Sequence, residues 1–208
     1  MIAVIDYDAG NVKSVEKALE KLGEEQILTS DPDVILNADA AILPGVGNFG
    51  DCMEKLRSKS LESTIKRFVE SGKPFLGICV GLQLLFESSE ESPGVSGLGI
   101  LKGHVKKFPA TDDLKVPQIG WNDVFDCRGK LFKGIGEHTF FYFVHSYYLE
   151  STDPGIVTTH TEYGLTYDSS VESGNVYATQ FHPEKSSDAG LLVLKNFIDI
   201  VKEGKDVN

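Results

Sequence analysis

Cys79 is the residue of this chain whose surroundings best suit nucleophilic chemistry. It lies between Gly77 and Gly81 in the run PFLGICVGLQLLF, residues 74–86. Glycines two residues before and after a nucleophile allow a sharp turn between a buried strand and a helix, and such a turn exposes its central side chain. At a helix start the free N–H groups favour a thiolate, and the N–H of Val80 would face a developing oxyanion. The alternative is a small thiol that only fills the core.

A thiol nucleophile requires a base, and His182 has the most suitable context. It stands in ATQFHPEKS, where a β-rich run meets a proline. Because residues i and i+2 of a strand share one face, we expect Glu184 to lie beside His182 and orient its ring. Alone, the pair is more often solvated at a strand end; together with Cys79, a Cys-His-Glu triad is the better interpretation. His145 is a weaker base, because Tyr147 rather than a carboxylate follows it. We expect three histidines at the surface: His104, His138 and His160.

The run PGVG at 44–47 is the third feature that could contribute to catalysis. It follows an apolar run and should end a strand that neighbours the strand leading to Cys79. Its glycines let the backbone approach a ligand closely and allow a peptide group to change orientation at low cost. The backbone N–H of Val46 or Gly47 would complete an oxyanion hole with that of Val80. Taken alone, this run is more often only a turn.

Strands and helices must alternate to place these features together. Apolar runs typical of buried strands lie at 2–6, 25–29, 40–45 and 74–78. Helical patterns begin at about Asn11 and also cover 49–70 and 80–90. This alternation predicts an α/β fold, with a doubly wound, mostly parallel open sheet and helices on both faces. In such a sheet function gathers in the loops that follow the strands, here 6–11, 44–49 and 77–83.

The second half of the chain has a different character. After SPGVSG at 92–97, six β-rich runs are separated by glycine, proline and aspartate turns. They favour antiparallel ribbons appended to the same sheet over a second domain. A helical pattern at 188–204 closes the chain, and neither a repeat nor a linker interrupts it. Residues 1–208 are therefore expected to form one domain.

Composition excludes several classes of function. The formal net charge is −11 over 208 residues, which argues against a nucleic-acid-binding face. The sequence contains neither a basic amphipathic helix nor an apolar run of about 18 residues, so it does not indicate a membrane partner. The start MIAVIDYDAGN lacks the basic segment of a signal peptide, so a cytoplasmic location is expected. Three widely spaced cysteines without a CxxC pair predict neither a disulfide framework nor a zinc site.

These motifs together resemble the class I (triad) glutamine amidotransferases, in family order over nearly the whole chain. Within that family the chain is most similar to the glutaminase subunits of imidazole glycerol phosphate synthases, which serve histidine biosynthesis, because it combines CVGLQ, PGVG and HPEKS. Subunits that serve anthranilate and aminobenzoate synthesis usually carry a CLGHQ-like run, and they lack the combination of PGVG with HPEKS. One departure is Asp8, where the family more often has glycine. The matching runs are DYDAGN (6–11), PGVGNFGD (44–51), GICVGLQLLFESSEE (77–91), GLGI (97–100), PQIGWN (117–122), FYFVHSYY (141–148) and ATQFHPEKSS (178–187).

The resemblance implies an enzyme that hydrolyses L-glutamine. Cys79 would attack the side-chain amide, His182 would act as base and then acid, and Glu184 would orient His182. Ammonia would leave, and water would then hydrolyse the glutamyl thioester. Neither a metal nor an organic cofactor is required. The resemblance places the glutamine contacts at Gly45, Gly47, Gln83, His145, Ser146 and Tyr147.

The resemblance also implies a heterodimer, because free ammonia would be protonated and lost. The partner would be the cyclase subunit, a (β/α)8 barrel. Packing within the β-rich half is the alternative explanation for Trp121 and Tyr142. Two other classes remain open: a binding module on a flavodoxin-like sheet, which needs no base, and a cysteine peptidase-like hydrolase, which should lack PGVG and Gln83. The positions that match the partner-facing side are Asn11, Trp121, Tyr142 and Lys185.

Overall fold

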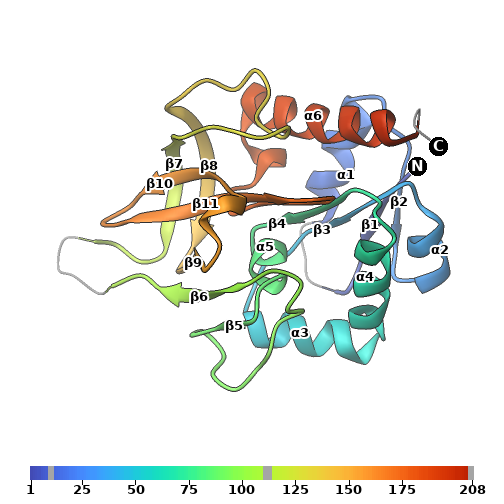
Figure 1. Cartoon of the computed structure of the whole chain (residues 1–208), viewed down its shortest axis with the longest axis horizontal. Coiled ribbons are helices and arrows are strands. Elements are labelled where there is room, and N and C mark those ends of the chain that lie inside the picture. The colour runs from blue at the N-terminus through green and yellow to red at the C-terminus, as the bar shows by residue number, and fades with distance from the viewer. Residues whose placement is uncertain (9–11, 110–113, 206–208) are drawn as a thin grey trace.

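The computed structural model describes residues 1–8, 12–109 and 114–205 (Figure 1). The predicted start of the first helix at Asn11, and the predicted interface role of that residue, lie outside the described residues. Within the described ranges, no helix combines the length and the apolar character needed to cross a membrane.

A ten-stranded sheet forms the centre of the described structure, in the order β2-β1-β3-β4-β12-β11-β9-β6-β5, with β10 paired to β11. The strands from β2 to β12 in this order pair in parallel. Four of them are buried throughout, as expected for strands covered on both faces. The predicted α/β fold with a mostly parallel sheet is confirmed. The parallel strands are β1 (Ile2–Ile5), β2 (Gln26–Thr29), β3 (Ala40–Leu43), β4 (Phe75–Ile78) and β12 (Val176–Thr179).

The β-rich second half extends this sheet and adds a separate two-stranded ribbon, β7-β8. The prediction of antiparallel ribbons is right for most of it and incomplete for β12, which pairs antiparallel with β11 but in parallel with β4. Its residues insert beside the strand of Cys79, a long-range pairing that local sequence does not encode. The other strands are β5 (Ser88–Ser89), β6 (Gly103–Lys107), β7 (Gln118–Val124), β8 (Thr139–His145), β9 (Tyr147–Ser151), β10 (Val157–Glu162) and β11 (Thr166–Ser173).

Helices cover both faces of the sheet. In Figure 1, α1 and α6 lie on one side of the sheet, and α3, α4 and α5 lie on the other. Asp31 caps α2 by accepting hydrogen bonds from two backbone N–H groups, and Asn48 caps α3 in the same way. The helices are α1 (Val12–Lys21), α2 (Pro32–Asn37), α3 (Phe49–Ser58), α4 (Leu61–Glu70), α5 (Val80–Leu84) and α6 (Ser187–Lys205), with short 3₁₀ turns η1 (Pro154–Ile156) and η2 (Pro183–Lys185).

Two helical predictions need correction, and one helix was missed. The pattern at 49–70 is two helices, α3 and α4, because Ser60 adopts a left-handed conformation with φ of 59°. The pattern at 80–90 ends at Leu84, because the carbonyl groups of Leu84 and Leu85 accept hydrogen bonds from residues 98–101 instead of continuing the helix. Helix α2 was not predicted; its six residues are too few to show a helical period.

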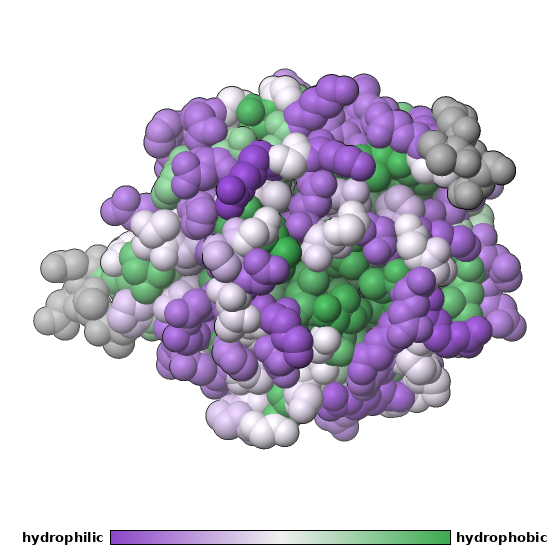
Figure 2. Space-filling model, in the orientation of Figure 1, coloured by the Kyte–Doolittle hydropathy of each residue, from purple (hydrophilic) through white to green (hydrophobic). Residues whose placement is uncertain are grey.

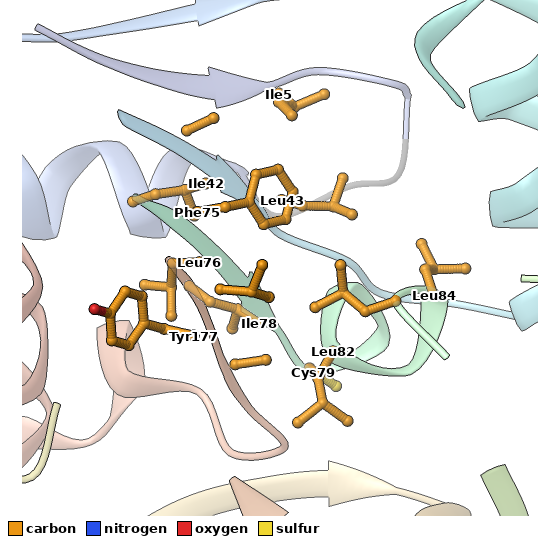
Figure 3. Close-up of a cluster of buried hydrophobic side chains, with 14 of the residues drawn as sticks. Ile5, Ile42, Leu43, Phe75, Leu76, Ile78, Cys79, Leu82, Leu84 and Tyr177 are labelled. Carbon is orange, nitrogen blue, oxygen red and sulfur yellow. The ribbon is translucent and has the colours of Figure 1, made fainter. Parts of the chain in front are cut away.

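The hydrophobic core includes the central strands along their length. Figure 3 shows apolar side chains of β1, β3 and β4 packed together, with Cys79 where β4 turns into α5. Figure 2 shows hydrophobic residues gathered near the middle of one face, with hydrophilic residues around them. The sheet therefore positions the Cys79 turn on a rigid, buried support.

Candidate active site

Cys79 lies on the predicted sharp turn between β4 and α5. Its backbone has φ of 55° and ψ of −111°, a strained conformation for a residue with a Cβ atom. Hydrogen bonds hold the turn from both sides: the Cys79 N–H donates to the Thr179 carbonyl at 2.8 Å, and the Cys79 carbonyl accepts from the Leu82 N–H at 3.0 Å. The chain therefore maintains a strained backbone at the proposed nucleophile, as in other nucleophile turns.

The glycines around Cys79 are required by close packing of backbones. A Cβ atom on Gly81 would lie 1.9 Å from the Leu43 carbonyl oxygen. A Cβ atom on Gly77 would lie 2.8 Å from the Gly81 carbonyl oxygen, and one on Gly45 would lie 2.7 Å from the Gly81 nitrogen. None of the three has a positive φ, so their small size rather than their flexibility matters here. Because these glycines have no side chain, α5, β4 and the PGVG run can pack closely against one another.

His182 and Glu184 form a buried pair beside Cys79. His182 Nδ1 lies 2.8 Å from Glu184 Oε1, and both side chains are only 2% exposed. The predicted pairing is present, but the predicted strand geometry is wrong. β12 ends at Thr179, and Glu184 belongs to the 3₁₀ turn η2, which bends it back onto the imidazole. A proline after His182 favours such a turn over a continued strand.

The charge state of His182 is set by its neighbours. Burial alone would lower its pKa, but the Cys79 thiolate and the Glu184 carboxylate raise the pKa of His182 more strongly, to about 10. Its other ring nitrogen, Nε2, is buried without a hydrogen-bond partner within the protein. Since Nδ1 is held by Glu184, Nε2 is the atom that can exchange a proton with the sulfur or a leaving group.

Two buried side chains hold the PGVG run. Tyr7 donates its hydroxyl hydrogen to the Pro44 carbonyl at 2.9 Å. Cys52 Sγ lies 3.7 Å from the Val46 carbonyl oxygen and donates to it. Gly47 has φ of 108°, a conformation that favours glycine. The contact of Cys52 was not predicted, because it depends on how α3 packs under the run.

A cavity of about 430 Å³ joins these features, a size typical of a small-molecule site. Glu184 is not part of its wall and lies behind His182. Gly45 is also outside the wall and packs against α5. The predicted residues that do line the cavity are Cys79, His182, Val46, Gly47, Val80, Gln83, His145, Ser146, Tyr147 and Lys185.

Gln83 and His145 have fixed orientations at this cavity. The Tyr147 carbonyl accepts a hydrogen bond from Gln83 Nε2 at 3.1 Å and from His145 Nδ1 at 2.8 Å. Burial lowers the pKa of His145 to about 4, so its ring is neutral at pH 7. Because its Nδ1 hydrogen is held by a carbonyl group, His145 lacks the carboxylate that would prepare it as a base.

Comparison with known proteins shows the family of this chain. The family model described as "Glutamine amidotransferase class-I" matches residues 3–200. This chain belongs to the class-I glutamine amidotransferase family. Among curated relatives, the imidazole glycerol phosphate synthase subunit HisH of Moorella thermoacetica is 52% identical, with 97% of this chain and 95% of the relative covered. HisH of Methanocaldococcus jannaschii is 48% identical, with 97% and 100% covered.

Solved structures share the fold of this amidotransferase chain. A crystal structure of a glutamine amidotransferase has a TM-score of 0.76 and 20% identity, covering 97% of this chain and 100% of its own. The structure of PurLQS from Thermotoga maritima has a TM-score of 0.74 and 22% identity, covering 96% and 98%. The expected resemblance, to the family and to its imidazole glycerol phosphate synthase branch, is confirmed.

Two polar side chains beside the cavity or the sulfur were not predicted individually. Glu91 lines the cavity and accepts a hydrogen bond from the Phe49 N–H at 2.7 Å; burial raises the pKa of Glu91. Gln180 is fully buried and places Nε2 at 3.7 Å from Cys79 Sγ. Glu91 ends the matched run GICVGLQLLFESSEE, and Gln180 lies in the matched run ATQFHPEKSS, so both runs indicated the site. Neither run shows which of its polar residues faces the cavity.

Of the predicted partner-facing residues that the structure describes, Trp121 and Tyr142 lie outside the cavity, whereas Lys185 lines it. Trp121 on β7 is 52% exposed and makes an edge contact with Tyr142 on β8. Lys185 Nζ lies 5.9 Å from the centre of the Tyr142 ring. The prediction of solvated histidines holds for His104 and His138 and is wrong in part for a third, since the side chain of His160 is only 26% exposed.

No group of three or more His, Cys, Asp or Glu side chains that could hold a metal ion occurs in the described ranges. Asp8 has φ of 62°, a conformation that glycine adopts easily and an aspartate tolerates, and it pairs with Lys59 at 2.8 Å.

Proposed function

We propose that this chain is the glutaminase subunit of an imidazole glycerol phosphate synthase. It hydrolyses L-glutamine to L-glutamate and ammonia and delivers the ammonia to a cyclase subunit for histidine biosynthesis. The observation that carries the proposal is a cavity in which Cys79 faces a buried His182–Glu184 pair, in a chain about half identical to HisH subunits over nearly its whole length. A binding module has no use for a strained cysteine beside a buried imidazole–carboxylate pair.

The residues support a thioester mechanism. Cys79 transfers its proton to His182 Nε2, and the sulfur attacks the side-chain carbonyl carbon of glutamine. The N–H of Val80, the first residue of α5, has no partner within its helix and stabilises the oxyanion together with a backbone N–H of Val46 or Gly47. His182 returns the proton to the leaving nitrogen, so ammonia departs. A water molecule, deprotonated by His182, then cleaves the thioester and releases glutamate.

Substrate binding follows from the charges at the cavity. The Gln83 amide presents its oxygen to the cavity, because its nitrogen already donates to the Tyr147 carbonyl and to Gln180. An oxygen acceptor and the Glu91 carboxylate suit the α-ammonium group of glutamine. We propose that the backbone of Ser146 and its neighbours contacts the rest of the amino-acid end, and that Gly45 acts indirectly by allowing α5 to pack closely.

The partner is proposed to dock on β7-β8. This ribbon carries the large hydrophobic side chains that are most exposed in the described structure: Ile119, Trp121 and Phe140. An exposed apolar patch of this kind marks a protein interface. Tyr142 connects the ribbon to the base, because its carbonyl accepts from the His182 N–H at 2.9 Å and its N–H donates to Ser186 Oγ at 2.9 Å. A partner that moves β8 would therefore move His182.

Glutamate release by the purified chain tests this function. We expect low activity for the chain alone, and stimulation by the cyclase subunit with its nucleotide ligand that appears in kcat rather than KM. The Cys79→Ala variant should lose glutamine hydrolysis. The Cys127→Ala variant should stay close to wild type, because the Cys127 thiol contacts the Gly136 carbonyl, away from the cavity. Wild-type turnover in Cys79→Ala would refute the nucleophile, and stimulation only by an anthranilate-type synthase would refute the partner.

A further inference from the structure

A buried amide lies against the sulfur of Cys79. Gln180 follows β12 and is 0% exposed, and its backbone N–H donates to the Ser169 carbonyl at 2.8 Å. Its side-chain Nε2 lies 3.7 Å from Cys79 Sγ and donates to it. Gln180 reaches the sulfur from the position directly after β12, and its hydrogen bond to the sulfur is separate from the His182–Glu184 pair. A glutamine buried this completely is uncommon and requires partners for its amide.

The orientation of the Gln180 amide is fixed by the Tyr147 backbone carbonyl, through the side chain of Gln83. The Tyr147 carbonyl can only accept, so the side chain of Gln83 must turn its NH₂ group toward it, at 3.1 Å. The same nitrogen of Gln83 donates to Gln180 Oε1 at 3.0 Å. With its oxygen held by Gln83, Gln180 must turn its own NH₂ group toward Cys79 Sγ. Reversal of either amide would place two donors or two acceptors together.

We propose that Gln180 is a further catalytic residue, whose side-chain N–H holds and stabilises the Cys79 thiolate. The inference rests on the proposed function, in which Cys79 is the nucleophile. In the thiol form the sulfur donates its hydrogen to the Val144 carbonyl at 3.8 Å. When the proton moves to His182 Nε2, that bond is lost and the N–H of Gln180 remains. A donor interacts more strongly with an anion than with a neutral thiol, so Gln180 favours the ionised sulfur.

Alkylation of Cys79 by iodoacetamide tests the proposal without glutamine. The rate for Cys79 is followed by peptide mass spectrometry from pH 5 to pH 10, because only the thiolate reacts. In Gln180→Met, which keeps the volume and removes the donor, the midpoint of the rate profile should rise by roughly one to two pH units, the effect of losing a hydrogen bond to a charged group. Gln180→Glu, which keeps the shape and the acceptor for Gln83, should shift it at least as far.

Gln118→Met is the matched control. Gln118 is also a buried glutamine, and its oxygen accepts a hydrogen bond from Tyr167 at 3.0 Å, but no hydrogen bond joins it to the sulfur. The alkylation profile of Gln118→Met should match wild type. In Gln180→Met, glutamine turnover should fall in kcat with little change in KM. Profiles of both Gln180 variants that superimpose on wild type, or an equal shift in Gln118→Met, would overturn the inference. If Gln180→Met shows the shift but the wild-type chain releases no glutamate even with the cyclase subunit and its nucleotide ligand, only the proposed function is overturned.

Discussion

Replacing Gly81 with alanine should destabilise the chain and distort the site at once. The added Cβ atom would lie 1.9 Å from the Leu43 carbonyl oxygen, whereas side-chain carbons essentially never approach closer than 3.0 Å. The two elements must therefore separate by 3.0 − 1.9 = 1.1 Å. Because β3 is held between β1 and β4, the five-residue helix α5 is the element that moves. Overpacking of this kind costs about 1–3 kcal/mol.

For a chain of this length, that loss corresponds to a melting temperature lower by about 2–12 °C. Urea unfolding and thermal melting, both followed by circular dichroism, measure the loss. Gly204→Ala is the matched control, because its Cβ would meet open space on helix α6, where alanine favours the helix by about 1 kcal/mol. Unfolding of Gly81→Ala at the same urea concentration as Gly204→Ala would show that the contact between Gly81 and Leu43 is not tight.

The same displacement should be visible in catalysis. A movement of α5 by about 1 Å carries the Val80 N–H away from the oxyanion and changes the position of Cys79. Misplacement on this scale reduces turnover by about 100-fold. Glutamate release by folded Gly81→Ala, measured at a temperature below its melting point, separates this effect from unfolding. Full turnover in a destabilised variant would show that the site tolerates the movement.

Three further predictions follow from the site. His182 and Glu184 act together, so adding Glu184→Gln to His182→Ala should lower glutamine turnover little further; losses that add in free energy would contradict this. Because the folded-state pKa of His182 is raised from 6.5 to about 10, its charge stabilises the fold fully below pH 6.5, and this contribution is lost as the pH rises through 10. The stability difference between wild type and His182→Gln in urea titrations should therefore shrink between pH 6.5 and pH 10, and a difference that grows would refute the assignment. Trp121→Ala should weaken stimulation by the cyclase subunit at least several-fold and leave basal glutamate release unchanged, since Trp121 is exposed and outside the cavity; stimulation equal to wild type would exclude β7 from the interface.

The sequence by itself determined the alternating strands and helices, because hydrophobic periodicity is a local property. It also identified the turn at Cys79, since glycines on both sides of a cysteine between a buried strand and a helix restrict the local backbone. The pairing of His182 with Glu184 was predicted from their spacing of two residues, as if on one face of a strand, although η2 rather than a strand brings the two side chains together. Helix α2 was not predictable because six residues are too few to show a helical period, and the early end of α5 was not predictable because it depends on hydrogen bonds from residues 98–101.

Only the tertiary structure decided which residues from distant parts of the chain meet at the sulfur. The parallel insertion of β12 beside β4 carries His182 and Gln180 to Cys79, about one hundred residues away in sequence. Packing of α3 places Cys52 against the Val46 carbonyl. These contacts arise because backbone hydrogen bonding and burial are satisfied over the whole sheet at once, and no single segment contains the information that specifies its neighbour in space.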